Sequence, residues 1–280
     1  MVFFLNGVSA IALLLIASSG LDLILGFMGV INLAHPGLMA LGGYGALVAS
    51  RYLPVWPSML LGAGLATVVG MLIEWLIVKR LYRRPLDTIL ATWGIALVIW
   101  QGLILIFGRV AYPFDGPVSG FISMSGFSYS AYRLLLIGIA FLLVAALGVI
   151  SRYTRVGLIA RAVMANGDLA AGLGLNTRAV QRWTFAIGVF MAGAAGALIA
   201  PLAPVQPFMG LSYLIPAFLV VLLAGKTVSG LVLGAVLIAG GQTAVSLFVN
   251  PIVASVFVVL IAVLLLRFFP GGFERLWGAR

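Results

Sequence analysis

Long apolar runs separated by short polar intervals make up most of this 280-residue chain. A membrane-spanning helix needs about 20 mostly apolar residues, with about 17–25 tolerated. Runs of this kind predict helices at 3–19, 31–50, 59–78, 89–108, 134–150, 183–200, 231–249 and 252–269. A further run, 211–224, is 14 residues long and contains Pro216, which predicts a half-helix or a re-entrant segment. The pattern predicts an all-α, polytopic membrane protein with about eight to nine transmembrane helices, folded as a single transmembrane domain over residues 1–280.

Composition strengthens this prediction, since 64% of the residues are hydrophobic and only 8% are charged. A soluble domain carries about 25% charged residues, which keep its surface wet. At a mean hydropathy of +1.25, there is too little polar material to cover a water-soluble core. The lack of cysteine excludes disulfides, a thiolate nucleophile and cysteine-based metal sites. No basic residue precedes the first run at Phe3, so no cleaved signal peptide is expected.

The distribution of basic residues predicts an orientation. A net charge of +10 would favour nucleic acid in a soluble chain, but membrane proteins collect Lys and Arg on the cytoplasmic side, so no nucleic-acid partner is expected. If the spans alternate, twelve basic residues share one side: Lys79, Arg80, Arg83, Arg84, Arg152, Arg155, Arg161, Arg178, Arg182, Arg267, Arg275 and Arg280. Arg51, Arg109 and Arg133 fall on the other side, and Lys226 is ambiguous. The positive-inside rule then predicts an external N-terminus and a cytoplasmic C-terminus, and so an odd number of crossings. Either 211–224 crosses, which gives the favoured total of nine, or the first run must be counted differently.

The segment 29–44, GVINLAHPGLMALGGY, interrupts one of the apolar runs with residues that disfavour a helix. Pro36 removes a backbone donor and crowds the preceding turn, while Gly37 lets neighbours approach. Asn32 and His35 are three residues apart, so a helical turn would place them on one face. A break inside the membrane is tolerated only where protein or a water-filled cavity satisfies the freed backbone groups. Two interpretations stay open: Asn32 and His35 satisfy the break by hydrogen bonding, or Asn32, His35, Pro36 and Gly37 line a translocation pathway.

The sequence offers no catalytic constellation. Its six acidic residues are scattered, with no pair at helical spacing that could share acid and base roles. The string AGKTVSG (224–230) imitates a phosphate-binding loop, but Val220 occupies the position of the required first glycine. No enzymatic activity, metal or cofactor is therefore expected. Polar side chains inside apolar runs are costly and so are candidates for function: Asp22, Asn32, His35, Glu74, Gln101 and Gln242.

The longest polar interval, 151–182, has the pattern of an ordered loop. Asn166 or Asp168 can cap a short helix, residues 169–171 favour helix, and Gly174 can end it in a left-handed conformation. We expect one short helix on the cytoplasmic face between two basic arms. On the opposite side, the loop 109–133 contains YPFDGPVSG and predicts either an ordered external cap or a docking surface for a partner.

The string DLAAGLGLN (168–176) resembles the EAA loop of ATP-binding cassette (ABC) importer permeases. Asp168 stands where Glu is usual, Leu169 replaces the first Ala, and Ala170 and Gly174 match that motif. The resemblance implies that 152–182 is a cytoplasmic coupling loop, in which Asp168, Ala170, Ala171 and Gly174 contact an ATPase subunit.

Four stretches in the same order make the chain similar to the inner-membrane permeases of branched-chain (hydrophobic) amino acid ABC importers. They are 26–44, 89–108, 161–198 and the glycine-rich region 225–241. The chain departs from that family at Pro36-Gly37, where relatives often show Gly-Glu, and at AGKTVSG, where the turn is often richer in glycine.

The resemblance implies a multi-subunit transporter in the bacterial inner membrane. This chain would supply half of the translocation pathway beside a paralogous permease or a second copy of itself, in contact with membrane lipid. Two ATP-binding cassette subunits would power it, and a periplasmic binding protein would deliver branched-chain amino acids or similar small solutes. Alternatives are a permease for urea or short-chain amides, a stand-alone secondary transporter or channel, and a non-transporting membrane scaffold.

Overall fold

The computed structural model describes residues 2–81, 84–124, 127–225 and 227–268. Several residues used to predict the topology lie outside these ranges: Arg83, Lys226, residue 269, Arg275 and Arg280. The helices are α1 (Val2–Asp22), α2 (His35–Ala49), α3 (Val55–Leu76), α4 (Pro85–Phe107), α5 (Ala131–Tyr153), α6 (Arg155–Ala165), α7 (Gly167–Gly172), α8 (Thr177–Ile199), α9 (Leu211–Ala224), α10 (Val228–Ala235), α11 (Gly241–Val245) and α12 (Pro251–Phe268). Short π-helical segments η1 (Leu23–Phe27) and η3 (Val236–Gly240) continue α1 and α10, and a 3₁₀ turn, η2 (Val78–Arg80), follows α3.

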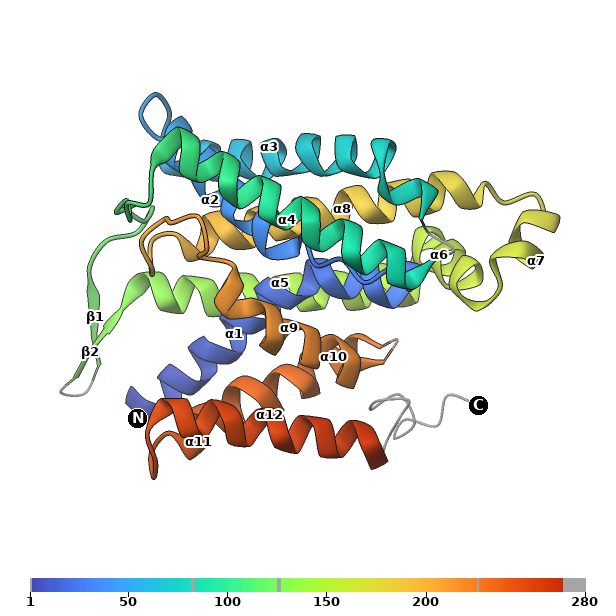
Figure 1. Ribbon diagram of the computed structural model, residues 1–280. Coiled ribbons are helices and arrows are strands. Elements are labelled where there is room, and N and C mark those ends of the chain that lie inside the picture. Colours follow the sequence, from blue (N-terminus) through green and yellow to red (C-terminus); the bar gives the residue numbers. More distant parts are fainter. Residues whose placement is uncertain (1, 82–83, 125–126, 226, 269–280) are drawn as a thin grey trace.

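The fold is the predicted polytopic α-helical bundle (Figure 1). Within the described ranges, seven helices are long and apolar enough to cross a membrane: Val2–Phe27, Val55–Arg80, Pro85–Phe107, Ala131–Tyr153, Thr177–Ile199, Val228–Val245 and Pro251–Phe268. Two shorter helices, α2 and α9, each follow a non-helical segment. The start of α1 and the end of α12 lie at opposite ends of the bundle, as an odd number of crossings requires. Which end faces the cytoplasm stays a prediction.

The predicted helix at 31–50 begins later than expected. Residues 29–34 are not helical, and α2 starts at His35. The short run 211–224 forms α9 with the predicted bounds and with Pro216 inside the helix. The segment before α9 reaches the middle of the bundle, because Gly210 lies against the backbone of Pro36.

Two apolar cores share α1. In the first, Ile16 and Ala17 of α1 join buried residues of α2, α4 and α8. In the second, Leu14 and Leu21, on other faces of α1, join buried residues of α9, α10 and α12. One face of the first helix is therefore buried by helices from the end of the chain.

Glycines bring α2 into backbone contact with two neighbours. A Cβ atom on Gly196 of α8 would collide with the carbonyl of Met39, and one on Gly42 would collide with Gly193. On the other side, Gly62 of α3 lies equally close to the carbonyl of Gly42. Lipid gives no hydrophobic drive for helix association, so such close packing supplies the attraction.

The loop at 109–133 is ordered around a small antiparallel hairpin that the all-α prediction missed. Strand β1 (Phe121–Met124) pairs with β2 (Phe127–Ser130), with Phe121 opposite Ser130. Tyr112 exchanges two backbone hydrogen bonds with Val205, which ties this loop to the segment before α9. The choice between a cap and a docking surface stays open.

Candidate functional site

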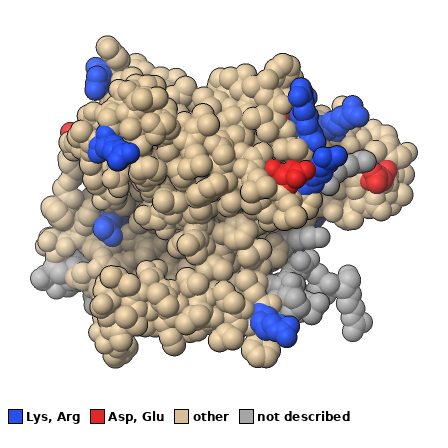
Figure 2. Space-filling model, viewed as in Figure 1, with Lys and Arg blue, Asp and Glu red and all other residues tan. Residues whose placement is uncertain are grey.

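A cleft of about 990 Å³ lies at the end of the bundle that carries α7. Figure 2 shows Lys, Arg, Asp and Glu gathered at this end. The cleft is lined by Met28, Glu74, Lys79, Arg80, Arg84, Gly167, Asp168, Ala171, Thr177, Arg178, Gln181 and Arg182. Two basic clusters that are far apart in the sequence thus face the same space.

The cleft wall is strongly basic. Its charged residues are five cations, from Lys79 to Arg182, and two carboxylates, Glu74 and Asp168. Glu74 is buried. The ammonium of Lys79 lies 4.8 Å from the centre of the Trp75 ring, an arrangement that holds its aliphatic stem along the end of α3.

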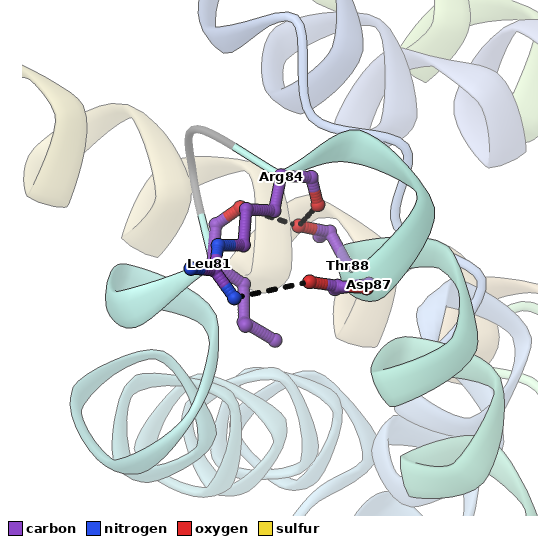
Figure 3. Close-up of polar contacts among 4 residues, drawn as sticks. All are labelled: Leu81, Arg84, Asp87 and Thr88. Atoms are coloured by element: carbon purple, nitrogen blue, oxygen red, sulfur yellow. Dashed lines mark hydrogen bonds and ion pairs between the residues drawn. The ribbon is translucent and has the colours of Figure 1, made fainter.

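Thr88 holds the turn that presents Arg84 to the cleft (Figure 3). Its hydroxyl lies 2.8 Å from the carbonyl of Leu81 and 2.9 Å from that of Arg84, so it closes the turn between η2 and α4. Asp87 forms an ion pair with Arg84 at 3.7 Å, but both side chains are more than half exposed. Pro85 begins α4, where its missing N–H costs no hydrogen bond.

We expect Thr88→Val to lower the free energy of unfolding by about 1–2 kcal/mol, because the partly buried carbonyls of Leu81 and Arg84 lose the hydroxyl donor that they share. Asp87→Asn is the matched control on the same turn, and its exposed ion pair contributes only about 0–1 kcal/mol. Thermal unfolding in detergent measures both. A larger loss for Asp87→Asn than for Thr88→Val would contradict this assignment.

The helix α7 has the local structure that its sequence predicts. The Asn166 side chain accepts a hydrogen bond from the N–H of Leu169 at 2.9 Å, which caps the helix. Asp168 lies in the first turn, where a carboxylate favours the helix dipole. Gly174 follows the helix with a φ of 85°, a left-handed conformation that suits glycine.

Two apolar side chains, one on α7 and one on the residue after it, are exposed. Leu169 is 63% exposed and Leu173 is 77% exposed, whereas Ala170 is buried against the chain. Asp168, Ala171 and Gly174 are at least partly exposed. The structure therefore brings together the four residues expected at the coupling site, three of them on the surface and Ala170 beneath it.

The expected basic arm before α7 is itself a helix, α6, which the sequence analysis missed. Thr154 caps it by accepting a hydrogen bond from the N–H of Gly157 at 3.1 Å. The arm after α7 is the predicted start of the next span, because Asn176 caps α8 at Thr177 through the N–H of Ala179. The Ser/Thr/Asn capping signal at Thr154 could have revealed α6.

The non-helical segment 29–34 and the start of α2, together called the interrupted crossing, form hydrogen bonds with two other helices. His35 Nε2 donates to the carbonyl of Ala17 in α1 at 2.8 Å, and the N–H of Leu33 donates to Thr92 Oγ1 in α4 at 3.1 Å. Asn32 Oδ1 accepts from the N–H of Ala34. Asn32 and His35 do not share a helical turn, because the helix begins only at His35.

Pro36 and Gly37 stand in the first turn of α2, not within a kinked helix. Proline is favoured there because the first turn has no partner for its missing N–H. Gly37 contacts Ile99 of α4, where an added Cβ would come within 3.3 Å of the Ile99 side chain. Asn32, His35, Pro36 and Gly37 are all buried within the chain, and their assignment to the pathway stays a prediction.

Apolar helices of spanning length, a buried helix that begins inside the bundle and a capped helix at one end are the features of a polytopic α-helical membrane protein. The family model described as branched-chain amino acid transport system / permease component matches residues 3–267. The chain belongs to this family.

Individual relatives agree with this assignment. The chain is 27% identical over 252 residues to the high-affinity branched-chain amino acid transport system permease protein LivH of Escherichia coli K12, covering 82% of each chain. It is 27% identical over 254 residues to LivH of Salmonella typhimurium, again with 82% of each covered. It is 26% identical over 251 residues to BraD of Pseudomonas aeruginosa, covering 83% of this chain and 82% of BraD. No solved structure matches the chain.

Proposed function

We propose that this chain is a permease subunit of an ABC importer that carries branched-chain amino acids across the bacterial inner membrane. The family match over residues 3–267 carries the proposal. The capped, exposed helix α7 supports it, since an importer without a nucleotide site of its own needs a surface on which an ATPase docks.

In this assembly, two permease subunits, paralogous or identical, enclose the pathway, and an ATP-binding cassette subunit docks on each α7. The basic cleft then lies on the cytoplasmic side, as the positive-inside rule favours. The N-terminus is external and the C-terminus cytoplasmic. A periplasmic binding protein docks at the opposite end, where the hairpin β1–β2 stands.

Movement of α7 reaches the middle of the bundle through α8. The cap at Asn176 fixes the start of α8 shortly after α7. The backbones of α8 and α2 are in direct contact. The start of α2 is in turn bonded to α1 through His35. Closure of two ATPase subunits around ATP therefore has a continuous, rigid route to the interrupted crossing. In this assignment, Asn32, His35, Pro36 and Gly37 border the pathway by holding the start of α2 in place.

Reconstitution of the complete transporter tests the proposal. With its ATPase subunits, a second permease and its binding protein in proteoliposomes, we expect ATP-dependent uptake of leucine, isoleucine or valine. Omitting ATP or the ATPase subunits is the control. Gradient-driven flux through this chain alone would overturn the proposal, and ATP-dependent uptake restricted to urea or short amides would reassign the solute.

A further inference from the structure

A second cavity, of about 310 Å³, lies between α1, α9 and α11. It reaches Ser246 and Pro251, which stand on either side of the turn from α11 to α12, at the end of the bundle where α1 begins. Small-molecule sites have volumes of about 300–1,000 Å³, so this cavity suits a small solute. None of the residues assigned so far to the pathway or to coupling lines it.

One wall of this cavity is polar. Ser212 and Tyr213 come from α9, and Gln242, Thr243 and Ser246 come from α11 and the residue after it. The hydroxyl of Thr243 donates to the carbonyl of Ala239 in η3, and that of Ser246 donates to the carbonyl of Thr243, so both oxygens can still accept a hydrogen bond. The amide of Gln242 adds donors and an acceptor. Such a side chain in an apolar run is costly unless it faces a polar or wet space.

Two irregularities of the backbone coincide with this wall. Pro216 lines the cavity and cannot donate to the carbonyl of Ser212, four residues earlier, which also lines it. On the other side, the π-helical segment η3 ends immediately before α11, the helix that carries Gln242. π-helical turns are frequent at functional sites, and interrupted helices often form the substrate sites of transporters.

The rest of the lining is apolar and includes Leu13 and Leu14 of α1 and Ala239 of η3. Among the described residues, none that lines the cavity carries a charge. A ligand that fits this lining is small, has a polar end and a branched apolar end, and is held without an ion pair.

Resting on the proposed function, we propose that this cavity is a station on the outer half of the solute pathway. It holds a branched-chain amino acid with its polar end on Gln242 and Tyr213 and its aliphatic side chain against Leu13 and Leu14. We expect weak binding, because the cavity offers hydrogen bonds but no charged side chain to the ammonium and carboxylate groups of the amino acid. Weak binding also suits a site on a pathway, which must release its solute.

Because the chain has no cysteine, single-cysteine variants test this directly in the complete, reconstituted transporter. We expect Gln242→Cys to react with a membrane-impermeant methanethiosulfonate reagent added outside, and saturating leucine to slow that reaction at least fivefold. Lysine, which carries an extra charge, should give no protection. Tyr52→Cys, 84% exposed before α3, should react without protection, and Ala34→Cys, 2% exposed beside His35, should not react.

Transport gives the second readout. We expect Gln242→Leu to reduce leucine uptake at least tenfold and Gln242→Asn to keep most of it, with ATPase subunits still bound. Gln206→Leu, the same change at an exposed position between α8 and α9 that lines neither cavity, is the matched control and should leave uptake unchanged.

Failure of this proposal differs from failure of the proposed function. Suppose that the Gln242→Cys transporter takes up leucine normally, but leucine does not protect its thiol, or only lipid-soluble maleimides reach that thiol. Either result would place the cavity off the pathway and make it a lipid-filled groove. No ATP-driven uptake of any branched-chain amino acid by the unsubstituted chain would overturn both proposals.

Discussion

Leu169→Arg on α7 should abolish ATP-driven uptake by the reconstituted transporter. The Leu169 side chain is 63% exposed at the end of the bundle, next to Leu173 at 77%, and an exposed apolar pair on a capped helix is the surface that a docked ATPase would bury. Loss of a central interface side chain costs about 2–4 kcal/mol, which corresponds to roughly 30- to 700-fold in affinity. Arginine adds a charge that the interface must desolvate, so we expect the upper half of this range. Binding of the purified ATPase subunit to the permease in nanodiscs measures it.

Val110→Arg is the matched control for this experiment. Val110 is 58% exposed in the loop after α4, at the opposite end of the bundle, so the same apolar-to-basic change should leave ATPase binding intact. Thermal unfolding should be unchanged for both variants, because neither position is buried. Equal ATPase binding by Leu169→Arg and the parent chain would remove α7 from the docking surface.

Gly196→Ala should destabilise the folded protein by at least about 3 kcal/mol, the upper part of the range for overpacking a well-packed interior. The new Cβ would collide with the backbone carbonyl of Met39, and backbone cannot rotate away as a side chain can. The helices α2 and α8 must therefore separate, and the first core opens with them. We expect a lower midpoint of thermal unfolding in detergent and a large fall in the yield of monodisperse protein.

The same substitution at Gly94 is the control. Gly94 lies in α4, and an added Cβ there has nothing within 4 Å. Alanine is favoured over glycine inside a helix by about 0.5–1 kcal/mol, so Gly94→Ala should be neutral or slightly stabilising. If Gly196→Ala and Gly94→Ala unfold at the same temperature, the contact between α2 and α8 is looser than the structure has it.

The helix α7 could be predicted from sequence because its signals are local. Asn166 caps the N–H of Leu169 three residues away, and Gly174 ends the helix through its own conformation. Neither depends on the rest of the fold. The apolar runs were equally informative, since the length of a span follows from bilayer thickness and not from neighbouring helices.

The interrupted crossing could be located but not resolved. A proline inside an apolar run predicts either a kink or a helix start, and the choice depends on partners distant in the sequence. Thr92 on α4 and Ala17 on α1 provide those partners for Leu33 and His35. With both available, residues 29–34 can leave the helix, and Pro36 takes its place in the first turn of α2.

The two cavities were beyond sequence reasoning for the same reason. The clusters at 79–84 and 178–182 were each visible as basic, but only the packing of α3 and α8 brings them to one cleft. Gln242 was recognised as costly, yet its neighbours Tyr213 and Leu13 come from distant helices. The hairpin β1–β2 was missed because its strands are four residues long and follow a loop rich in proline and glycine.

The sharing of α1 between two cores has a consequence for how the protein is made. The ribosome releases α1 first and α9, α10 and α12 last, so Leu14 and Leu21 wait for their partners through most of translation. Lipid tails solvate leucine as well as protein does, so exposing this face of α1 to the bilayer costs no free energy. Meanwhile Ile16 and Ala17 can already assemble the first core. Before α9 is made, the incomplete chain can therefore be stable in the membrane, and the C-terminal helices later displace lipid from the face of α1 that carries Leu14 and Leu21.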